Sequence, residues 1–392
     1  MSNYLLSTYS RINLSFTHGK GAWLFTDDKK RYLDFASGIA VSCLGHSNPI
    51  LLKALKSQSE KLWHTSNLYN IKEQERLAQE LCNKSFADKV FFCNSGAEAT
   101  EGLIKLARKY HHIKGDFLKK DIIVLDNAFH GRTITGVQAG SNSLHKEGFL
   151  AKEDCSCGFI RVPLGDIECL KKKINPNTAA IFFEPIQGEG GINVCPKNYL
   201  KQIRKICNQN SILMILDEVQ CGIGRTGKVF AYEWWNVKPD MVGLAKGLGG
   251  GFPIGAILLK NKIAKCITPG SHGSTFGGNQ LACAVSLAVM KEISKKKLLN
   301  NVLNLGVFLE KKINKILSNN NSVITEVFGK GLMLGIKCIV PNSDIAKILR
   351  EKGLLVVPAS NNVIRLLPPL NITKKEAQKA IDIINEAVND LK

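Results

Sequence analysis

Seven short apolar runs alternate with helical stretches through the middle of the chain, and this alternation limits the possible folds most strongly. Each run is four or five residues long. Strands that alternate with helices form an α/β fold with a mainly parallel sheet covered on both faces, and ligands bind beyond the carboxyl ends of its strands. The expected strands are residues 89–93, 122–125, 159–162, 179–183, 212–216, 241–245 and 256–259, and the clearest helices are residues 98–113, 198–208 and 280–295.

The pattern changes on either side of this central region, which predicts a second, smaller domain. The N-terminal residues contain short strand-like runs, and the C-terminal residues alternate helices and strands in a way typical of an α+β unit. We therefore expect N-terminal strands within residues 1–49 that join the smaller domain, a large α/β domain over residues 50–298, and the small α+β domain over residues 299–392. A chain of 392 residues has room for two cores.

Composition is that of an ordinary globular enzyme and argues against several other classes. The formal net charge is +20, but the lysines are scattered without a nucleic-acid-binding motif, so we expect no nucleic-acid partner and keep a basic nucleic-acid binder only as an alternative. No apolar run approaches the roughly 18 residues of a membrane span, and no secretory signal is expected. We expect a cytoplasmic protein with reduced cysteines and no metal site, since Cys155 and Cys157 lack a second pair of ligands.

Two charged residues end apolar runs that read as buried strands. Lys246 follows the run at residues 241–245 and precedes a glycine cluster, and Asp217 follows the run at residues 212–216. Burial lowers the pKa of an ammonium group and leaves a neutral amine, which is a nucleophile. Pyridoxal phosphate requires an amine for a Schiff base and a carboxylate for its pyridinium nitrogen. Taken alone, however, a lysine before glycines is more often a solvated loop residue.

Two further segments at expected strand ends carry groups suited to the same ligand. Ser95, Gly96 and Ala97 open a helix, and the free N–H groups at a helix N-terminus favour a phosphate, although a plain N-cap by Ser95 has the same sequence. Phe129 and Arg132 follow the run at residues 122–125. An aromatic ring and a guanidinium there can stack on a flat cofactor and hold a carboxylate, or can equally be a core residue and a surface ion pair.

Two glycine-rich segments complete the set. Glycines flank Glu189 after the run at residues 179–183, which indicates close approach of the backbone to a ligand or an ordinary structural loop. Ser274 and Thr275 lie in another glycine-rich segment, ahead of an expected helix, where their hydroxyls can contact a phosphate.

The segment from Gly222 to Val229 matches two nucleotide-binding patterns, G-x-G-x-x-G and G-x-x-x-x-G-K. Val229 stands where a P-loop needs Ser or Thr for Mg²⁺, so the second match is incomplete. Asp217 and Glu218 lie just before the segment and would repel a phosphate placed there. A P-loop ATPase is therefore kept only as the alternative from a different class.

Together these segments make the chain similar to the class III, fold-type I aminotransferases, which depend on pyridoxal 5′-phosphate. The similarity covers nearly the whole chain and is specific for the class more than for the substrate. The motifs that carry it are Asp34-Phe35 to Gly45-His46, Asn94 to Ala99, Phe129 to Thr133, Glu184 to Gly190, Leu216 to Gln220 with Gly222 to Gly227, Ala245-Lys246, and His272 to Asn279.

The resemblance implies a role for each matching residue. Lys246 would bind the cofactor covalently and then move the proton, while Asp217 would keep the pyridine nitrogen protonated. Arg365 would bind the α-carboxylate of glutamate or 2-oxoglutarate, with Glu189 as its switchable partner. The other implied contacts are Gln220 with the ring hydroxyl, Phe129 stacked on the ring, Ser95, Gly96 and Ala97 with the phosphate together with the partner's Thr275, and Arg132 and Ser274 with the amino donor. Sites shared in this way imply a homodimer.

The resemblance also implies a substrate pair. The terminal amino group of N2-acetylornithine would pass to 2-oxoglutarate, as a step of arginine biosynthesis. Ile39 stands where ornithine-specific members tend to place a tyrosine, and its apolar side chain suits an acylated amine better than a free ammonium. Ornithine, succinylornithine and N-succinyl-diaminopimelate are the alternative donors.

Overall fold

The protein is described by a computed structural model that covers residues 4–150, 158–319 and 323–391. Its largest element is a seven-stranded sheet in the order β4-β12-β11-β10-β7-β5-β6. All neighbouring pairs are parallel except those of β12, which runs antiparallel to both β11 and β4. The strands are β4 (Lys89–Cys93), β5 (Asp121–Leu125), β6 (Phe159–Val162), β7 (Thr178–Phe183), β10 (Leu213–Asp217), β11 (Met241–Leu244) and β12 (Gly255–Leu259). The predicted α/β fold with a mainly parallel sheet is confirmed.

Helices cover both faces of this sheet, because its central strands β7, β10 and β11 are buried at every position. In β7, Phe182 belongs to a core cluster with Leu103 of α4, while Ile181 belongs to the other cluster with Ile203 of α7. Successive strand residues point to opposite faces, so α4 and α7 lie on opposite sides of the sheet. The helices of this part are α2 (Pro49–Ser59), α3 (Lys72–Lys84), α4 (Gly96–Ile113), α5 (Ile134–Ala139), α6 (Ile167–Lys173), α7 (Tyr199–Gln209), α8 (Asn261–Ala264) and α9 (Gln280–Ile293).

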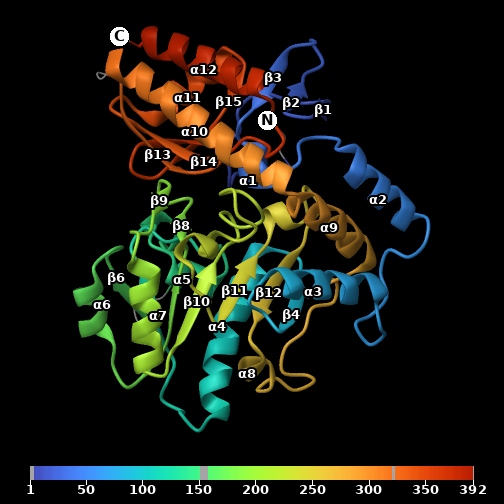
Figure 1. Ribbon diagram of the computed structural model, residues 1–392, viewed down its shortest axis with the longest axis vertical. Helices are drawn as coiled ribbons and strands as arrows, with labels where there is room; N and C mark the ends of the chain where they lie inside the picture. Colours follow the sequence, from blue (N-terminus) through green and yellow to red (C-terminus); the bar gives the residue numbers. More distant parts are fainter. Residues whose placement is uncertain (1–3, 151–157, 320–322, 392) are drawn as a thin grey trace.

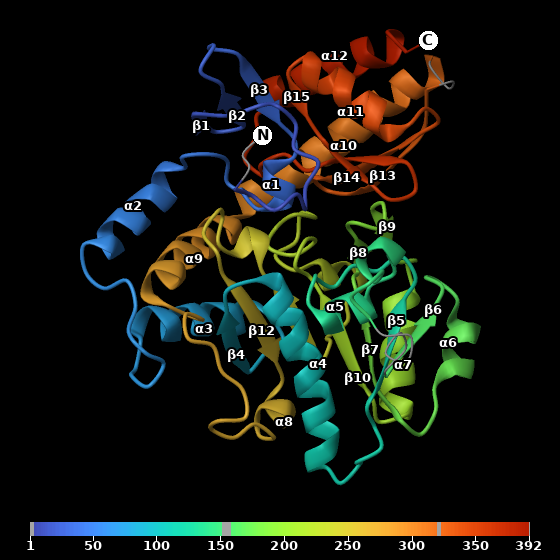
Figure 2. The ribbon, with the colours of Figure 1, turned by 180° about the vertical axis from the view of Figure 1, so that it is seen from behind.

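Two four-stranded sheets and three helices form most of the remaining described residues, and β8 (Ile186–Gln187) and β9 (Asn193–Val194) form a separate two-stranded sheet. In Figures 1 and 2 the C-terminal helices and the N-terminal strands lie side by side above the large sheet. The N-terminal β3 pairs in parallel with β15 from the C-terminal part, which joins the two ends of the chain. The elements are β1 (His18–Lys20), β2 (Trp23–Phe25), β3 (Arg31–Asp34) and β15 (Leu354–Leu355) in one sheet, β13 (Ile324–Lys330), β14 (Met333–Cys338), β16 (Val357–Ala359) and β17 (Val363–Leu366) in the other, and α10 (Lys296–Asn319), α11 (Asn342–Glu351) and α12 (Lys374–Asn389).

The elements differ from the expected ones in a few places. The run from Leu354 to Pro358 has the sequence pattern of one strand but forms β15 and β16, because the first pairs with β3 and the second with β17. The sequence has helical spacing from Ile50 to Trp63, but α2 ends at Ser59. Helix α3 was not expected, because only Leu77 and Leu81 are buried on it. The division into domains after residues 49 and 298 stays a prediction.

Two further expectations concern a metal site and a membrane-spanning segment. The cysteine pair Cys155 and Cys157 lies outside the described residues. Within the described ranges no cluster of three or more potential metal ligands is present. No helix in the described part of the chain combines the length and the apolar character needed to cross a membrane.

Candidate active site

A cavity of about 390 Å³ lies at the carboxyl ends of β4, β10 and β11, and most of the site residues expected from the sequence border it. Natural ligand pockets have volumes of this size. The expected residues among its lining are Ser95, Gly96, Ala97, Phe129, Arg132, Glu189, Asp217, Gln220 and Lys246. Residues far apart in the sequence therefore meet in one cavity because the strands that precede them are neighbours in the sheet.

Lys246 follows the buried strand β11 and has a positive φ of 42°. A lysine in this left-handed region is strained, and such strain persists only where the surroundings hold it. Burial lowers the pKa of the Lys246 ammonium, and the Arg365 guanidinium lowers it further. The side chain borders the cavity, and its lowered pKa makes the neutral, nucleophilic form of the amine more accessible.

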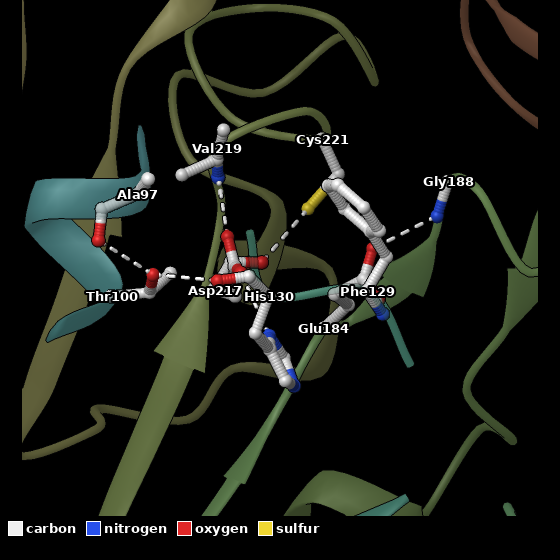
Figure 3. A network of polar contacts seen from close by, with 9 residues as sticks. All are labelled: Ala97, Thr100, Phe129, His130, Glu184, Gly188, Asp217, Val219 and Cys221. Carbon is white, nitrogen blue, oxygen red and sulfur yellow. Dashed lines mark hydrogen bonds and ion pairs between the residues drawn. The ribbon is translucent and has the colours of Figure 1, made fainter. Parts of the chain in front are cut away.

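Asp217 ends β10, and its carboxylate is 4% exposed. One oxygen, Oδ2, lies 2.8 Å from His130 Nδ1, and the other accepts a hydrogen bond from the Val219 N–H at 3.0 Å (Figure 3). His130 is stacked on Phe182, with ring centroids 4.0 Å apart, and its Nε2 is buried without a hydrogen-bond partner. We assign the ring proton to Nδ1, because that tautomer donates to Asp217 and leaves no unpaired donor at Nε2. The pair presents a fixed carboxylate at the base of the cavity.

The N-terminus of α4 forms one wall of the cavity. Ser95 caps the helix by accepting a hydrogen bond from the Glu98 N–H at 3.2 Å. Thr100 donates through its hydroxyl to the His130 carbonyl at 2.6 Å and lies 2.9 Å from the Ala97 carbonyl, so the helix is tied to the loop that follows β5 (Figure 3). A Cβ on Gly96 would lie 2.8 Å from a methyl group of Val219, so glycine is required for this approach. The first N–H groups of α4 are thereby held facing the cavity, where they favour an anion.

Two arginines lie on different sides of this space. Arg132 borders the cavity, with its guanidinium carbon 5.7 Å from the centre of the Phe129 ring. Arg365, on β17, is 1% exposed and lies beside the cavity without being among its lining residues. Its Nη2 is 3.0 Å from Glu189 Oε2, and its Nη1 donates to Gln220 at 3.4 Å. Burial lowers the pKa of Arg365, and the Glu189 carboxylate opposes that effect, so the ion pair compensates for the buried charge.

Three residues named from the sequence are not brought to the cavity of this chain. Ser274 accepts hydrogen bonds through its hydroxyl from Asn94 at 3.1 Å and from the Gly277 N–H at 3.0 Å. Thr275 is exposed in the same loop. Ile39 is 41% exposed and lies in α1 (Ser37–Ala40), a turn whose residues all have positive φ.

The segment from Gly222 to Gly227 offers no room for a nucleotide. A Cβ on Gly227 would lie 2.3 Å from Leu303 of α10, and one on Gly224 would lie 3.0 Å from Ile293 of α9. Arg225 is buried and donates to the carbonyls of Leu332 and Pro368. The glycines therefore allow the large-sheet loop to pack against the C-terminal part of the chain.

Sequence reasoning did not single out His130 and Glu184 as site residues, although both border the cavity. Both stand inside the motifs used for the resemblance, His130 next to Phe129 and Glu184 directly after β7. A titratable residue at the end of an apolar strand was the available signal, and it is the same signal that identified Asp217 and Lys246. Their partners, 55 and 87 residues away in sequence, needed the fold.

The comparisons with known proteins agree with this geometry. The family model described as "Aminotransferase class-III" matches residues 5–388. The chain belongs to the class III aminotransferase family. This aminotransferase is 47% identical over 387 residues to an acetylornithine aminotransferase of Brucella melitensis, covering 99% of this chain and 95% of that protein. It is 49% identical over 387 residues to one of Mesorhizobium japonicum, covering 99% and 96%.

Solved structures of the family superpose over nearly the whole aminotransferase. The N-acetylornithine aminotransferase of Stenotrophomonas maltophilia has a TM-score of 0.86 at 35% identity, covering 98% of this chain and 97% of that one. The ornithine aminotransferase of Toxoplasma gondii has a TM-score of 0.94 at 31% identity, covering 99% and 93%. A second structure of the Toxoplasma enzyme has pyridoxal phosphate at partial occupancy in its active site.

The cavity of this aminotransferase fits its family cofactor, pyridoxal 5′-phosphate. The N-terminus of α4 presents N–H groups to a phosphate, and the Asp217 carboxylate faces the same space. The Phe129 ring and the Lys246 amine complete a lining suited to a flat, anionic aldehyde.

Proposed function

We propose that this aminotransferase transfers the terminal amino group of N2-acetyl-L-ornithine to 2-oxoglutarate. The products are N-acetyl-L-glutamate 5-semialdehyde and L-glutamate, and the step belongs to arginine biosynthesis. The observation that carries the proposal is the Arg365–Glu189 ion pair at 3.0 Å beside the cavity. The names of the relatives described above support the acetylated donor.

An enzyme with two unlike amino donors must recognise both in one cavity. Glutamate brings its α-carboxylate close to the reacting amine, whereas N-acetylornithine reacts at the far end of its side chain. We infer that Arg365 binds the α-carboxylate of glutamate after Glu189 has moved away. With the acetylated donor, Glu189 stays on Arg365 and neutralises it, while Arg132, with Ser274, holds the distant carboxylate.

The residues of the chain divide the chemistry among them. When bound, pyridoxal phosphate supplies an electron sink for the C–H bond that is broken beside the amino group. Lys246 would bind it covalently and then carry the proton, because its pKa is lowered toward the working range. The Asp217 carboxylate, held by His130, would keep the ring nitrogen protonated. We assign the phosphate to Ser95, Gly96 and Ala97, the ring face to Phe129 and the ring hydroxyl to Gln220.

We also propose a cytoplasmic homodimer that shares its active sites. Thr275 is exposed in its own chain, and Phe276 beside it is 57% exposed. The neighbouring Leu68 and Tyr69 are 86% and 69% exposed, and Asn67 binds the Ser274 carbonyl, so the two segments form one apolar surface. The partner's Thr275 would complete the phosphate site. Free cysteines throughout the described ranges agree with a reducing compartment.

A panel of amino donors tests the proposed substrate. The purified enzyme is supplied with 2-oxoglutarate and, in turn, N-acetylornithine, ornithine, succinylornithine and N-succinyl-diaminopimelate. We expect N-acetylornithine to give the highest kcat/KM. A higher value for any other donor would replace the proposed substrate and leave the family assignment unchanged.

A further inference from the structure

Glu184 is a buried carboxylate at the edge of the cavity that the proposed reaction does not yet use. It follows β7 directly and is 6% exposed. Its Oε1 accepts a hydrogen bond from the Phe129 N–H at 3.1 Å, and its Oε2 accepts one from the Gly188 N–H at 2.9 Å. Figure 3 shows the carboxylate between these two backbone segments. One side chain therefore holds the loop after β5 and the loop that leads to Glu189.

The surroundings of Glu184 contain several titratable groups. Asp217 faces it from the end of β10, His130 faces it from the loop after β5, and Lys246 interacts with it from the end of β11. Burial, and next the Asp217 charge, raise the pKa of Glu184 well above its usual range, while His130 and the two N–H groups oppose that effect. Burying a carboxylate beside a second one is costly. This cost indicates that Glu184 has a functional role or a role in ordering the loops that it binds.

The loop that Glu184 holds is also tied to the C-terminal part of the chain, where Asn361 donates to the Gly190 carbonyl at 3.0 Å. The Ser360 N–H, from the same part of the chain, donates to the Glu189 carbonyl at 3.1 Å. On the side of the large sheet, Glu184 accepts a hydrogen bond from the N–H of Gly188, the residue before Glu189. The Glu189 side chain then reaches Arg365 at 3.0 Å. The position of the Glu189 carboxylate is thus set from both sides of the cavity.

We propose that Glu184 is a positioning residue that keeps Glu189 paired with Arg365, and so favours the donor that needs Arg365 neutralised over glutamate. The inference rests on the proposed function of the Arg365–Glu189 pair. Loss of the Gly188 anchor frees the loop and weakens the ion pair. Arg365 is then open to the α-carboxylate of glutamate more of the time, whereas the acetylated donor meets an unpaired buried cation.

The test compares the two half-reactions in Glu184→Gln. The amide keeps the shape of the side chain but offers one oxygen to two N–H groups, so one anchor is lost. We expect the ratio of kcat/KM for glutamate to that for N-acetylornithine to rise about tenfold, as the loss of one hydrogen bond to a charged group produces. In crystals of the variant, Glu189 should no longer pair with Arg365. A general loss of structure would instead lower both half-reactions equally, which would overturn the proposal.

Glu218→Gln is the matched control. Glu218 is also fully buried and accepts two backbone hydrogen bonds, from Ala231 at 2.6 Å and Tyr232 at 2.7 Å, but it does not border the cavity. The same chemical change there should lower the melting temperature and leave the ratio within about twofold of wild type, since no contact to Glu189 is touched. An equal rise of the ratio in both variants would contradict a specific role for Glu184.

A double-mutant cycle separates this inference from the proposed function. Glu189→Gln alone should raise the ratio, and adding Glu184→Gln should raise it no further, because both changes act through one ion pair. If the two effects multiply, Glu184 does not act through Glu189, and the inference fails while the proposed function stands. If Glu189→Gln leaves the ratio unchanged, the pair is not a switch, and both proposals fail.

Discussion

Two glycine-bearing segments follow strands of the large sheet, and only one of them borders open space. Gly96 begins α4 beside the cavity, with the first N–H groups of the helix facing it. Gly227 ends the loop after β10, and the space that its missing side chain leaves is filled by Leu303. The second segment has the better match to a nucleotide-binding pattern, yet it serves packing. A glycine motif therefore indicates close approach, and the fold decides whether a ligand or the protein itself approaches.

The largest effect is expected for a substitution of Lys246, which borders the cavity. Lys246→Ala should abolish turnover and leave the fold intact, because the amine faces the cavity and its removal disturbs no strand. Activity assays and thermal melting of the same preparation check both parts. Wild-type turnover in the variant would contradict the assignment of the cavity.

Asp217→Asn comes next. The amide still fits beside His130, but it carries no charge to hold a ring nitrogen protonated. We expect kcat to fall on the order of 100-fold or more, the usual scale for losing a fixed electrostatic partner. Steady-state rates, together with the absorbance of the bound cofactor, measure this. Near-normal rates with an unchanged spectrum would exclude the proposed role.

Arg132 and Arg365 should separate the two half-reactions. Arg365→Ala should impair the reaction with glutamate more, and Arg132→Ala the reaction with N-acetylornithine more. Truncating one partner of a desolvated carboxylate pair costs roughly 2–5 kcal/mol. Single-turnover rates with each donor decide it, and equal losses in both half-reactions for both variants would refute the assignment.

Substitutions in the packed loop after β10 should lower the stability of the protein and leave its activity unchanged. Gly227→Ala places a Cβ 2.3 Å from Leu303 at a residue with a φ of 87°. We expect the free energy of unfolding to fall by about 1–3 kcal/mol, while the folded protein keeps its turnover. Denaturant melts and rates per folded molecule give the two numbers. A selective loss of cofactor binding without loss of stability would reopen a ligand role for this loop.

The smallest effect is expected at Ile39. Ile39→Tyr should narrow the preference for N-acetylornithine over ornithine by a few-fold, because a hydroxyl can receive a free ammonium where an apolar side chain cannot. The side chain is partly exposed and only its neighbour Val41 borders the cavity, so the effect is smaller than at the arginines. The ratio of kcat/KM for the two donors, measured on both proteins, checks it. An unchanged ratio would show that Ile39 does not determine the preference between the two donors.

Much of the large sheet could be predicted because its strands are continuous apolar runs. Residues 179–183 were expected as a strand and lie within β7, which is buried at every position, and the charged residues after such runs, Asp217 and Lys246, meet in the cavity. The local sequence pattern suffices there, because a strand that is buried on both faces is apolar at nearly every residue.

The remainder depends on contacts between distant segments. Helix α3 buries only Leu77 and Leu81, and its many charged residues make this narrow apolar stripe hard to recognise in the sequence. The bonds of Glu184 to Phe129 and Gly188 join loops whose relation only the sheet order determines. The exposed Thr275 illustrates a further limit, because its proposed role lies in a second copy of the chain.

The most direct test of the account is the position of the covalently bound cofactor. The protein purified with pyridoxal phosphate is reduced with borohydride, digested and mapped by mass spectrometry. We expect the pyridoxyl group on Lys246, which borders the cavity, and an unmodified Lys228, which directly follows the packed segment from Gly222 to Gly227. Modification of Lys228 or of another lysine in place of Lys246 would contradict it.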